Sequence, residues 1–322
     1  MIEPTIADIK EAAARISPYT HRTPIFTSAT VNRLAEAEVF FKCENLQKTG
    51  AFKARGAINA VYSIAKDSAG NGVATHSSGN HAAALAYAAR CRGIKAFVVM
   101  PENAPPVKIA AVAEYGAEIK FCPPTQKDRE ETLQAVVRDR GAVAVHPYND
   151  HKVIAGQATA AHELLEEVPR LDALITPVGG GGLLSGTLLA VSASKRNTAV
   201  YGAEPAGADD AYRSLQAGHL IPVQDPDTIA DGLRTSLGNL TFPIIQKYAA
   251  AILTVDDPII IGTMKMLWER MKLIVEPSAV LPVAVLLHRR EQIRANRIGL
   301  IISGGNVDLD YLPWQSGSKR KE

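Results

Sequence analysis

A lysine at the start of a small-residue segment is the first candidate for chemistry in this chain. Lys53 follows a glycine turn at Gly50 and stands among Phe52, Ala54 and Ala57, so its amine is expected in a poorly solvated place. Desolvation penalises the ammonium form and lowers the pKa of a lysine, and the neutral amine attacks carbonyl carbon. The alternative is an ordinary lysine whose stem covers an apolar helix face while its charged end reaches water.

Four consecutive glycines are the second candidate, because they lie between a predicted strand at 173–177 and a predicted helix that ends at about 194. They are Gly179, Gly180, Gly181 and Gly182. Successive backbone N–H groups at a helix N-terminus attract an anion such as phosphate. The run matches neither the GxGxxG dinucleotide fingerprint nor the phosphate loop that contains Gly-Lys-Ser/Thr. A flexible hinge is the alternative.

Two further turns place polar side chains directly after predicted strands. One covers residues 75–81, with two serines, an asparagine and two histidines, and the other is Ser303-Gly304-Gly305-Asn306. A helix cap uses one such side chain, so the first turn is more polar than a cap requires. An ordinary cap and an ordinary loop are the alternatives. Open parallel sheets bind ligands beyond the carboxyl ends of their strands, where both turns are expected.

An acidic segment follows the predicted strand at 200–203. Glu204, Asp209 and Asp210 occur within seven residues, with a bend at Gly207. Carboxylate oxygens at this spacing are ligands for a hard cation such as Mg²⁺. A solvated acidic turn with an aspartate cap on the next helix is the alternative.

A single ligand accounts for the lysine, the glycines and the polar turns. It needs a carbonyl for the amine, a phosphate for the glycine run and a ring whose edge meets polar side chains. Pyridoxal 5′-phosphate (PLP) has all three, so these residues predict PLP as the cofactor.

The elements that must position these residues alternate between strands and helices over most of the chain. Strands are expected at 38–43, 73–75, 96–100, 118–121, 142–145, 173–177, 200–203 and 298–302. Helices are expected at 5–16, from the lysine segment to about 66, and at 80–90, 105–115, 127–138, 157–167, 257–271 and 277–289. This alternation predicts an α/β fold with parallel sheets. We expect a small α/β domain at 72–148, inserted into a large domain made of 1–71 and 149–322.

Composition excludes several classes of function. The chain has 322 residues, 47% of them hydrophobic and 21% charged, and a net charge of only +2. This balance gives no electrostatic footprint for nucleic acid or a membrane surface. No apolar run reaches the roughly 18 residues of a membrane helix. Cys43, Cys91 and Cys122 form no CxxC pair, which indicates buried thiols in a reducing compartment and a cytoplasmic protein.

Together the motifs resemble the fold type II PLP enzymes, and among them the serine racemase and serine/threonine dehydratase group. The matching segments are residues 48–56, 77–81, 179–182 and 303–306, and the likeness extends from about residue 5 to about 312. It implies a fold like that of the tryptophan synthase β chain. In that fold two parallel-sheet-based domains hold the cofactor between them.

The resemblance implies roles for individual residues. Lys53 would join the cofactor aldehyde through an imine and act as acid and base on one face of the substrate Cα. Phe52 would pack near the ring, Asn80 would bind its hydroxyl, and Ser303 would meet the pyridine nitrogen. The other implied cofactor contacts are Gly179, Gly180, Gly181, Gly182, Leu183, Gly232 and Glu276. The implied substrate contacts are Ser77, Ser78, Asn80, His81, Arg129 and Thr235.

Ser78 bears on which reaction the enzyme performs. Racemisation needs acid/base groups on both faces of Cα, and Lys53 and Ser78 would supply them. Threonine dehydratases typically carry alanine at this position, whereas hydroxyaspartate dehydratases of similar pattern also carry serine. We therefore predict a serine racemase that also dehydrates serine to pyruvate and ammonia. The alternative is a dehydratase for L-serine, L-threonine or threo-3-hydroxyaspartate without significant racemisation.

The resemblance also implies a metal, a subunit partner and an effector. Glu204, the carbonyl of Ala208, and Asp210 match a divalent-cation loop for Mg²⁺, or for Ca²⁺ or Mn²⁺. A homodimer is implied, and Lys48, Thr49 and Tyr115 fall where related animal enzymes contact ATP between subunits. Two functions of other classes remain as rivals. A nicotinamide-dependent oxidoreductase would leave Lys53 and Ser303 without roles, and a non-catalytic amino-acid sensor would not need them.

Overall fold

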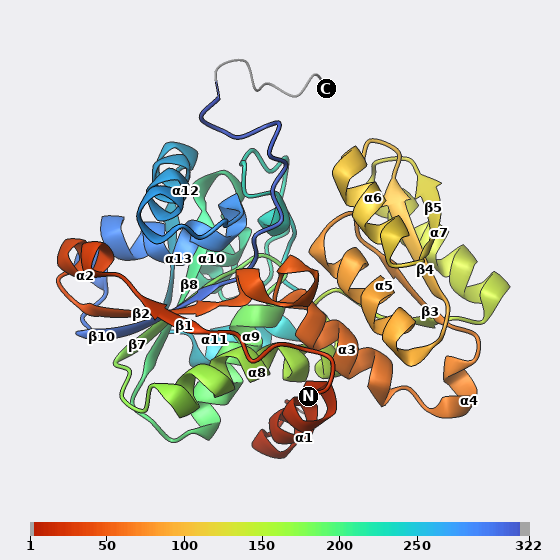
Figure 1. Cartoon of the computed structure of the whole chain (residues 1–322), viewed down its shortest axis with the longest axis horizontal. Helices are drawn as coiled ribbons and strands as arrows, with labels where there is room; N and C mark the ends of the chain where they lie inside the picture. Colours follow the sequence, from red (N-terminus) through yellow and green to blue (C-terminus); the bar gives the residue numbers. More distant parts are fainter. Residues whose placement is uncertain (1–2, 316–322) are drawn as a thin grey trace.

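Two sheets, one in each lobe of the molecule, carry the architecture of this computed structural model, which describes residues 3–315 (Figure 1). The larger sheet has the order β1-β2-β10-β7-β8-β9 and the smaller one β5-β4-β3-β6. Every neighbouring pair is parallel except β1 with β2, an antiparallel addition at one edge. The larger sheet consists of β1 (Ile25–Thr27), β2 (Glu38–Cys43), β10 (Arg297–Ile302), β7 (Ala173–Pro177), β8 (Ala199–Pro205) and β9 (Ala251–Val255). The smaller consists of β5 (Glu118–Cys122), β4 (Ala96–Pro101), β3 (Val73–His76) and β6 (Val143–Ala144).

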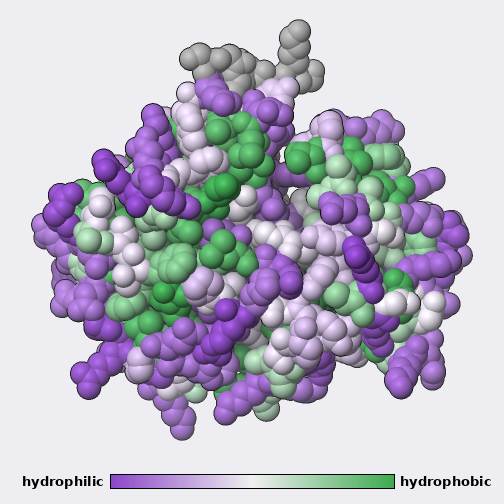
Figure 2. Space-filling view, in the orientation of Figure 1, coloured by the Kyte–Doolittle hydropathy of each residue, from purple (hydrophilic) through white to green (hydrophobic). Residues whose placement is uncertain are grey.

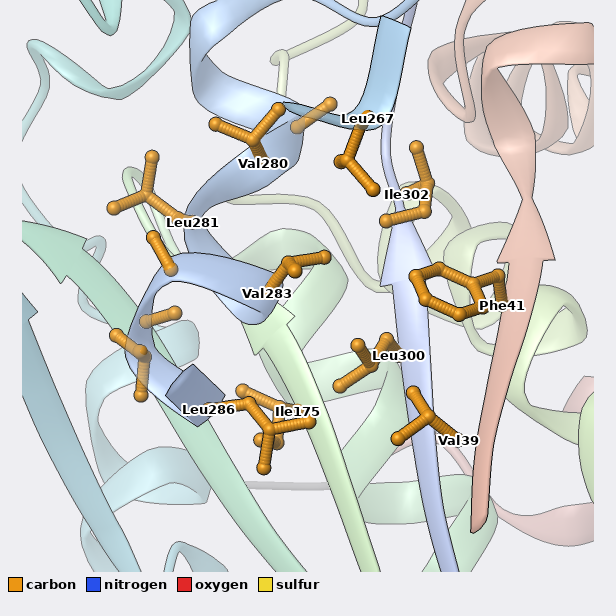
Figure 3. Packing of buried hydrophobic residues seen from close by; sticks show 14 of the residues in the cluster. Val39, Phe41, Ile175, Leu267, Val280, Leu281, Val283, Leu286, Leu300 and Ile302 are labelled. Atoms are coloured by element: carbon orange, nitrogen blue, oxygen red, sulfur yellow. The ribbon is translucent and has the colours of Figure 1, made fainter. Parts of the chain in front are cut away.

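Helices cover both faces of the six-stranded sheet. Val283 and Leu286 of α13 pack in one buried cluster with Ile175 of β7 and Leu300 of β10 (Figure 3). Ile301 lies in the cluster under α8 and α9 instead, because successive strand residues point to opposite faces. The helices of this lobe are α1 (Ile6–Ile16), α2 (Ala29–Ala35), α8 (His151–Glu167), α9 (Gly182–Ala193), α10 (Asp210–Ala217), α11 (Thr241–Tyr248), α12 (Asp257–Met271) and α13 (Pro277–His288).

The four-stranded sheet is also covered on both faces. Val98 and Met100 of β4 pack with Ala82 and Val112 under α5 (Asn80–Arg92) and α6 (Pro106–Glu114). Phe97 packs in a separate cluster under α7 (Gln126–Arg140). The sheet lies within residues 73–144, inside the range predicted for the small domain. The division of the chain into two domains stays a prediction.

Helix α3 (Lys53–Ser63) lies where the two lobes meet. Ile58 and Val61 are buried in one cluster with Leu85 of α5. On another side, a Cβ added to Gly156 of α8 would come within 2.6 Å of the Cα of Gly56. The backbones of α3 and α8 therefore approach closely, and α3 is fixed against both lobes at the point where Lys53 begins it.

The expected α/β fold with parallel sheets is confirmed, and β2 and α12 have the predicted bounds. Helix α8 begins at His151, six residues earlier than expected, where the carboxylate of Asp150 accepts hydrogen bonds from the first N–H groups. The sequence did not predict β1, α2, α10, α11 or β9, because segments of three to eight residues show too little of their periodicity. Cys43 and Cys122 are buried as expected, whereas Cys91 is half-buried. No helix within residues 3–315 is long and apolar enough to cross a membrane.

Candidate active site

The lysine segment pairs directly with the turn that follows β10. Phe52 N donates to Ser303 O at 2.9 Å, Gly305 N donates to Gly50 O at 2.9 Å, and Ala51 forms an isolated bridge with Gly304. Ser303 is buried. Backbone pairing thus brings together two segments that the sequence separates by about 250 residues, and it holds the Ser303 side chain beside the start of α3.

Among the residues that the structure describes, the amine of Lys53 has one hydrogen-bond partner. Its Nζ donates to the carbonyl of Pro147 at 2.9 Å. Solvent reaches part of the residue, but the surrounding protein removes most of the hydration of the amine. This burial lowers the pKa of Lys53 to about 8, and the nearby carboxylate of Glu276 offsets part of the effect. The neutral amine is therefore more populated near neutral pH than in an ordinary lysine.

Tyr148 follows Pro147, whose carbonyl binds Lys53, and packs against the glycine run. A Cβ on Gly180 would overlap the Tyr148 ring, and the hydroxyl of this tyrosine lies 3.1 Å from Thr235 Oγ1. Gly181 has a φ of +87° and precedes the first residue of α9, a conformation that side chains other than glycine rarely adopt. On the other side, a Cβ on Gly179 would come within 3.3 Å of Gly232 O. The run is thus closely packed backbone at a helix N-terminus, between Tyr148 and Gly232.

Asn80 joins the two lobes through side-chain hydrogen bonds. Its Nδ2 donates to both carboxylate oxygens of Glu276, at 2.9 and 3.2 Å, and its Oδ1 accepts from Asn306 Nδ2 at 2.9 Å. Burial raises the pKa of Glu276 to about 7, and the charge of Asp231 acts in the same direction. The polar turn after β3 and the turn after β10 therefore meet at one buried carboxyl group.

Two histidines, His81 and His146, lie close enough to the lysine to feel its charge. Burial, helped by the charge of Lys53, lowers the pKa of His81 well below its usual value. Burial also lowers the pKa of His146 to about 4, with His76 and Lys53 acting in the same direction. Both imidazoles are neutral at neutral pH. His146 was not among the predicted site residues, because nothing local distinguishes it from any residue after a short strand.

The remaining predicted substrate residues have fewer contacts with Lys53 and its neighbours. Ser77 Oγ accepts a weak hydrogen bond from Gly79 N at 3.4 Å, and Ser78 lies between them in the same turn. Arg129 belongs to α7, and its Nε donates to Thr125 O at 3.3 Å. Its charge helps burial to lower the pKa of His76, so Arg129 faces the same turn from the small lobe.

The acidic segment forms a separate buried site at the end of β8. The carboxylate of Glu204 accepts from Ala211 N at 2.9 Å and Tyr212 N at 2.8 Å. Both oxygens of Asp210 are buried without a hydrogen-bond partner in the part of the chain that the structure describes. Burial raises the pKa of Asp210 to about 7 and that of Glu204 well above its usual value. Within residues 3–315 no three His, Cys, Asp or Glu side chains cluster as metal ligands, so a cation here would also need backbone oxygen.

The residues present fit PLP on three counts. The Lys53 amine has a lowered pKa, which suits bond formation with an aldehyde. No described side chain forms a capping hydrogen bond at the start of α9, so its first N–H groups suit a phosphate. Ser303 and Asn80 offer a hydroxyl and an amide near the same lysine, which suits the edge of a polar ring.

Comparison with known proteins gives the same picture. Residues 16–304 match the family model described as "Pyridoxal-phosphate dependent enzyme". The chain is 49% identical to the β-hydroxyaspartate dehydratase of Paracoccus denitrificans (strain Pd 1222), over 98% of this chain and 100% of that protein. It is 48% identical to the serine racemase of Dictyostelium discoideum, over 96% of each chain. The structure of maize serine racemase superposes with a TM-score of 0.94 at 44% identity, covering 96% of this chain and 95% of that one.

Proposed function

The chain belongs to the pyridoxal-phosphate dependent enzymes of fold type II, and on that premise we propose that it interconverts L-serine and D-serine and also converts serine to pyruvate and ammonia. The observation that carries the proposal is the Lys53 amine, which has a lowered pKa and lies near the turn that contains Ser78 and His81. When bound, PLP supplies a ring that stabilises the negative charge left on Cα by proton removal. Every other task falls to side chains and backbone of this chain.

Lys53 and Ser78 would act on opposite faces of the substrate. Lys53, with a pKa of about 8, exchanges a proton with Cα on one face near neutral pH. Ser78 delivers or removes the proton on the other face. Ser77, Asn80 and His81 would bind the substrate carboxylate, and Arg129 and Thr235 would border the space for its side chain.

The cofactor would be held by groups that do not themselves move protons. Phe52 would pack near the ring, Asn80 would bind the ring hydroxyl, and Ser303 would meet the ring nitrogen with a neutral hydroxyl. Gly232 and Glu276 would lie beside the ring. The phosphate would rest on Gly179, Gly180, Gly181, Gly182 and the N–H of Leu183.

A second function is favoured by one comparison. The β-hydroxyaspartate dehydratase of Paracoccus denitrificans is 49% identical to this chain over nearly its whole length. A dehydratase for L-serine, L-threonine or threo-3-hydroxyaspartate therefore remains the alternative. In that case elimination of the β-hydroxyl would proceed without significant return of a proton to Cα.

Incubation with L-serine, followed by chiral chromatography and a pyruvate assay, distinguishes the two. We expect both D-serine and pyruvate. The Ser78→Ala variant should lose racemisation by about 100-fold, the usual minimum for removal of a general acid or base, while elimination from L-serine falls far less. Pyruvate without D-serine from the unaltered enzyme would reject racemisation. Equal loss of both activities in the variant would reject the two-face assignment.

We also propose a divalent cation, Mg²⁺ or else Ca²⁺ or Mn²⁺, between Glu204, the carbonyl of Ala208 and Asp210. Two buried carboxylates with raised pKa values support it, since a cation would supply the missing partner. Addition of EDTA should lower the melting temperature by several degrees, because the cation binds only the folded state. The Asp210→Asn variant should already melt lower and should not respond to EDTA. An equal response of both proteins to EDTA would reject this site.

A homodimer and a nucleotide effector complete the proposal. Leu46 and Ile274 are exposed by 44% and 51% and are neighbours, because Asn45 Nδ2 donates to Ile274 O. Figure 2 shows hydrophobic residues at the surface on one face of the molecule, and protein interfaces cover surface of this kind. Sedimentation as a monomer at micromolar concentration would reject the dimer.

ATP would bind at Lys48, Thr49 and Tyr115 between subunits, and unchanged kinetics with ATP would reject that effector. A cytoplasmic location is proposed from the free thiols and is checked by cell fractionation.

A further inference from the structure

An ion pair joins the two lobes. The ammonium of Lys108, on α6 of the small lobe, contacts the carboxylate of Asp231, in the short helix η4 (Asp231–Leu233) of the large lobe. The two side chains are 25% and 41% exposed, so solvent reaches the pair and a ligand can compete for it.

The ammonium lies over the turn proposed to bind the substrate. A Cβ on Gly79 would be 3.9 Å from Lys108 Nζ, and Gly79 is flanked by Ser78 and Asn80. Asp231 adjoins Gly232, which lies against the glycine run. The charges of Lys108 and Asp231 shift the pKa of Glu276 in opposite directions, so the pair lies near the Asn80–Glu276 hydrogen bond.

The side-chain carboxylate of a dicarboxylic substrate would find few cations here. Lys108 has three donor hydrogens and uses one contact, to Asp231 Oδ2. Among the described residues, Lys53 and Arg129 also act on this turn, through His81 and His76, but Lys53 is the proposed cofactor lysine and the Nε of Arg129 is bound to Thr125 O. β-Hydroxyaspartate, named in the description of one relative, differs from serine by such a second carboxylate.

We propose that Lys108 determines whether this enzyme accepts dicarboxylic amino acids, an inference that rests on the proposed function and names a substrate class for the same site. The ammonium of Lys108 binds the side-chain carboxylate of a substrate such as threo-3-hydroxyaspartate or aspartate. Asp231 is the internal anion that this carboxylate must displace. With serine, which has no side-chain charge, the Lys108–Asp231 pair stays intact over the bound substrate.

The proposal separates the two members of the pair. If the ion pair served only to hold the lobes together, removal of either charge would weaken every ligand alike. If Lys108 recognises a carboxylate, loss of Lys108 weakens dicarboxylates selectively, whereas loss of Asp231 frees the ammonium and strengthens them. The two variants break the same ion pair, yet they should change dicarboxylate affinity in opposite directions.

The test measures binding of succinate and butanoate to the holoenzyme by calorimetry. These ligands share a four-carbon chain and differ by one carboxylate. We expect Lys108→Met to weaken succinate about tenfold relative to butanoate, as for loss of a charged hydrogen bond, and Asp231→Asn to tighten it a few-fold. Lys108→Arg should restore most of the affinity. The control Lys247→Met breaks a different surface ion pair, with Glu3. It should leave the ratio of succinate to butanoate affinity unchanged.

Several results would overturn the proposal. These are equal weakening by both variants, loss of succinate affinity in Arg129→Met in place of Lys108→Met, and failure of the unaltered enzyme to bind succinate. The ratio of kcat/KM for threo-3-hydroxyaspartate over that for L-serine should fall in Lys108→Met. If the unaltered enzyme acted on neither substrate, the proposed function would fail, while the succinate measurements would still decide the role of Lys108.

Discussion

Two residues apart on the first turn of α3, Lys53 and Arg55 lie in opposite electrostatic surroundings. Arg55 is fully buried and makes bidentate contacts with Glu44, at 2.7 and 2.8 Å, and with Glu163, at 2.7 and 2.9 Å. Lys42 adds a second buried cation, 2.6 Å from Glu163. Lys53, by contrast, donates a hydrogen bond to the Pro147 carbonyl and forms no ion pair with a carboxylate within residues 3–315.

The difference separates a buried charge that holds structure from one that is available for chemistry. Although burial alone would lower it, the pKa of Arg55 is raised, because two carboxylates surround the guanidinium. The pKa of Lys53 is lowered to about 8, because the charge of Glu276 offsets only part of the effect of its burial. Since buried ion networks fix geometry more reliably than they add stability, we interpret the Arg55 cluster as the anchor that orients α3 and hence Lys53.

The largest effect is expected from removal of the unpaired amine. Lys53→Ala should lose turnover by at least about 1,000-fold, since both proton transfer and attachment of the cofactor depend on this amine. The purified enzyme should also lose an absorbance band near ~410 nm, which is characteristic of a lysine-bound PLP. The unfolding free energy should change little, because no buried carboxylate is left without a partner. A variant that kept the band would show that another group holds the cofactor.

Removal of the paired cation should act on stability instead. Arg55→Met leaves Glu44 and Glu163 as buried carboxylates without their main partner, which costs about 3–5 kcal/mol of unfolding free energy. Urea denaturation measures this loss. The matched control is Arg22→Met, whose guanidinium pairs with Glu166 and Glu167 at the surface and should cost less than about 1 kcal/mol. Similar losses in the two variants would contradict the anchoring role of the cluster.

The sequence predicted the features that depend on local pattern. A lysine among small residues, four glycines before a helix and polar residues after strands are all visible within ten residues. Parallel strands then bring such turns to one edge of a sheet, so their assembly could be expected without coordinates.

Contacts between distant segments could not be predicted in this way. Arg55 and Glu163 are 108 residues apart, and Lys108 and Asp231 are 123 apart. A charged residue shows in its sequence neighbourhood neither how deeply it is buried nor which partner it meets. For the same reason the sequence did not show that the Tyr148 ring packs against Gly180. This contact is why the position requires glycine.

The smallest expected effect is on the pH dependence of stability. It differs between Glu276, near the active-site lysine, and Glu163, in the Arg55 cluster. Burial raises the folded-state pKa of Glu276 to about 7 from an ordinary value of 4.5, so between these limits the folded state keeps a proton that the unfolded chain releases. The contribution of Glu276 to stability therefore falls as pH rises from 4.5 to 7. Between pH 4.5 and 7 the unfolding free energy of the unaltered protein should therefore decline by roughly 1–3 kcal/mol through Glu276, and Glu276→Gln should remove this decline. Urea denaturation of cofactor-free protein at several pH values measures it.

Glu163 should behave in the opposite way, because its pKa is lowered by Arg55 and Lys42 despite burial. Its contribution is present above the ordinary pKa of 4.5 and is lost as pH falls through the lower folded-state value. Glu163→Gln should therefore flatten the loss of stability in acid, whereas Glu276→Gln flattens the decline toward neutral pH. If both variants changed the same part of the curve, burial alone would govern these carboxyl groups. The presence or absence of oppositely charged buried partners would then not be what distinguishes the Arg55 cluster from the active site.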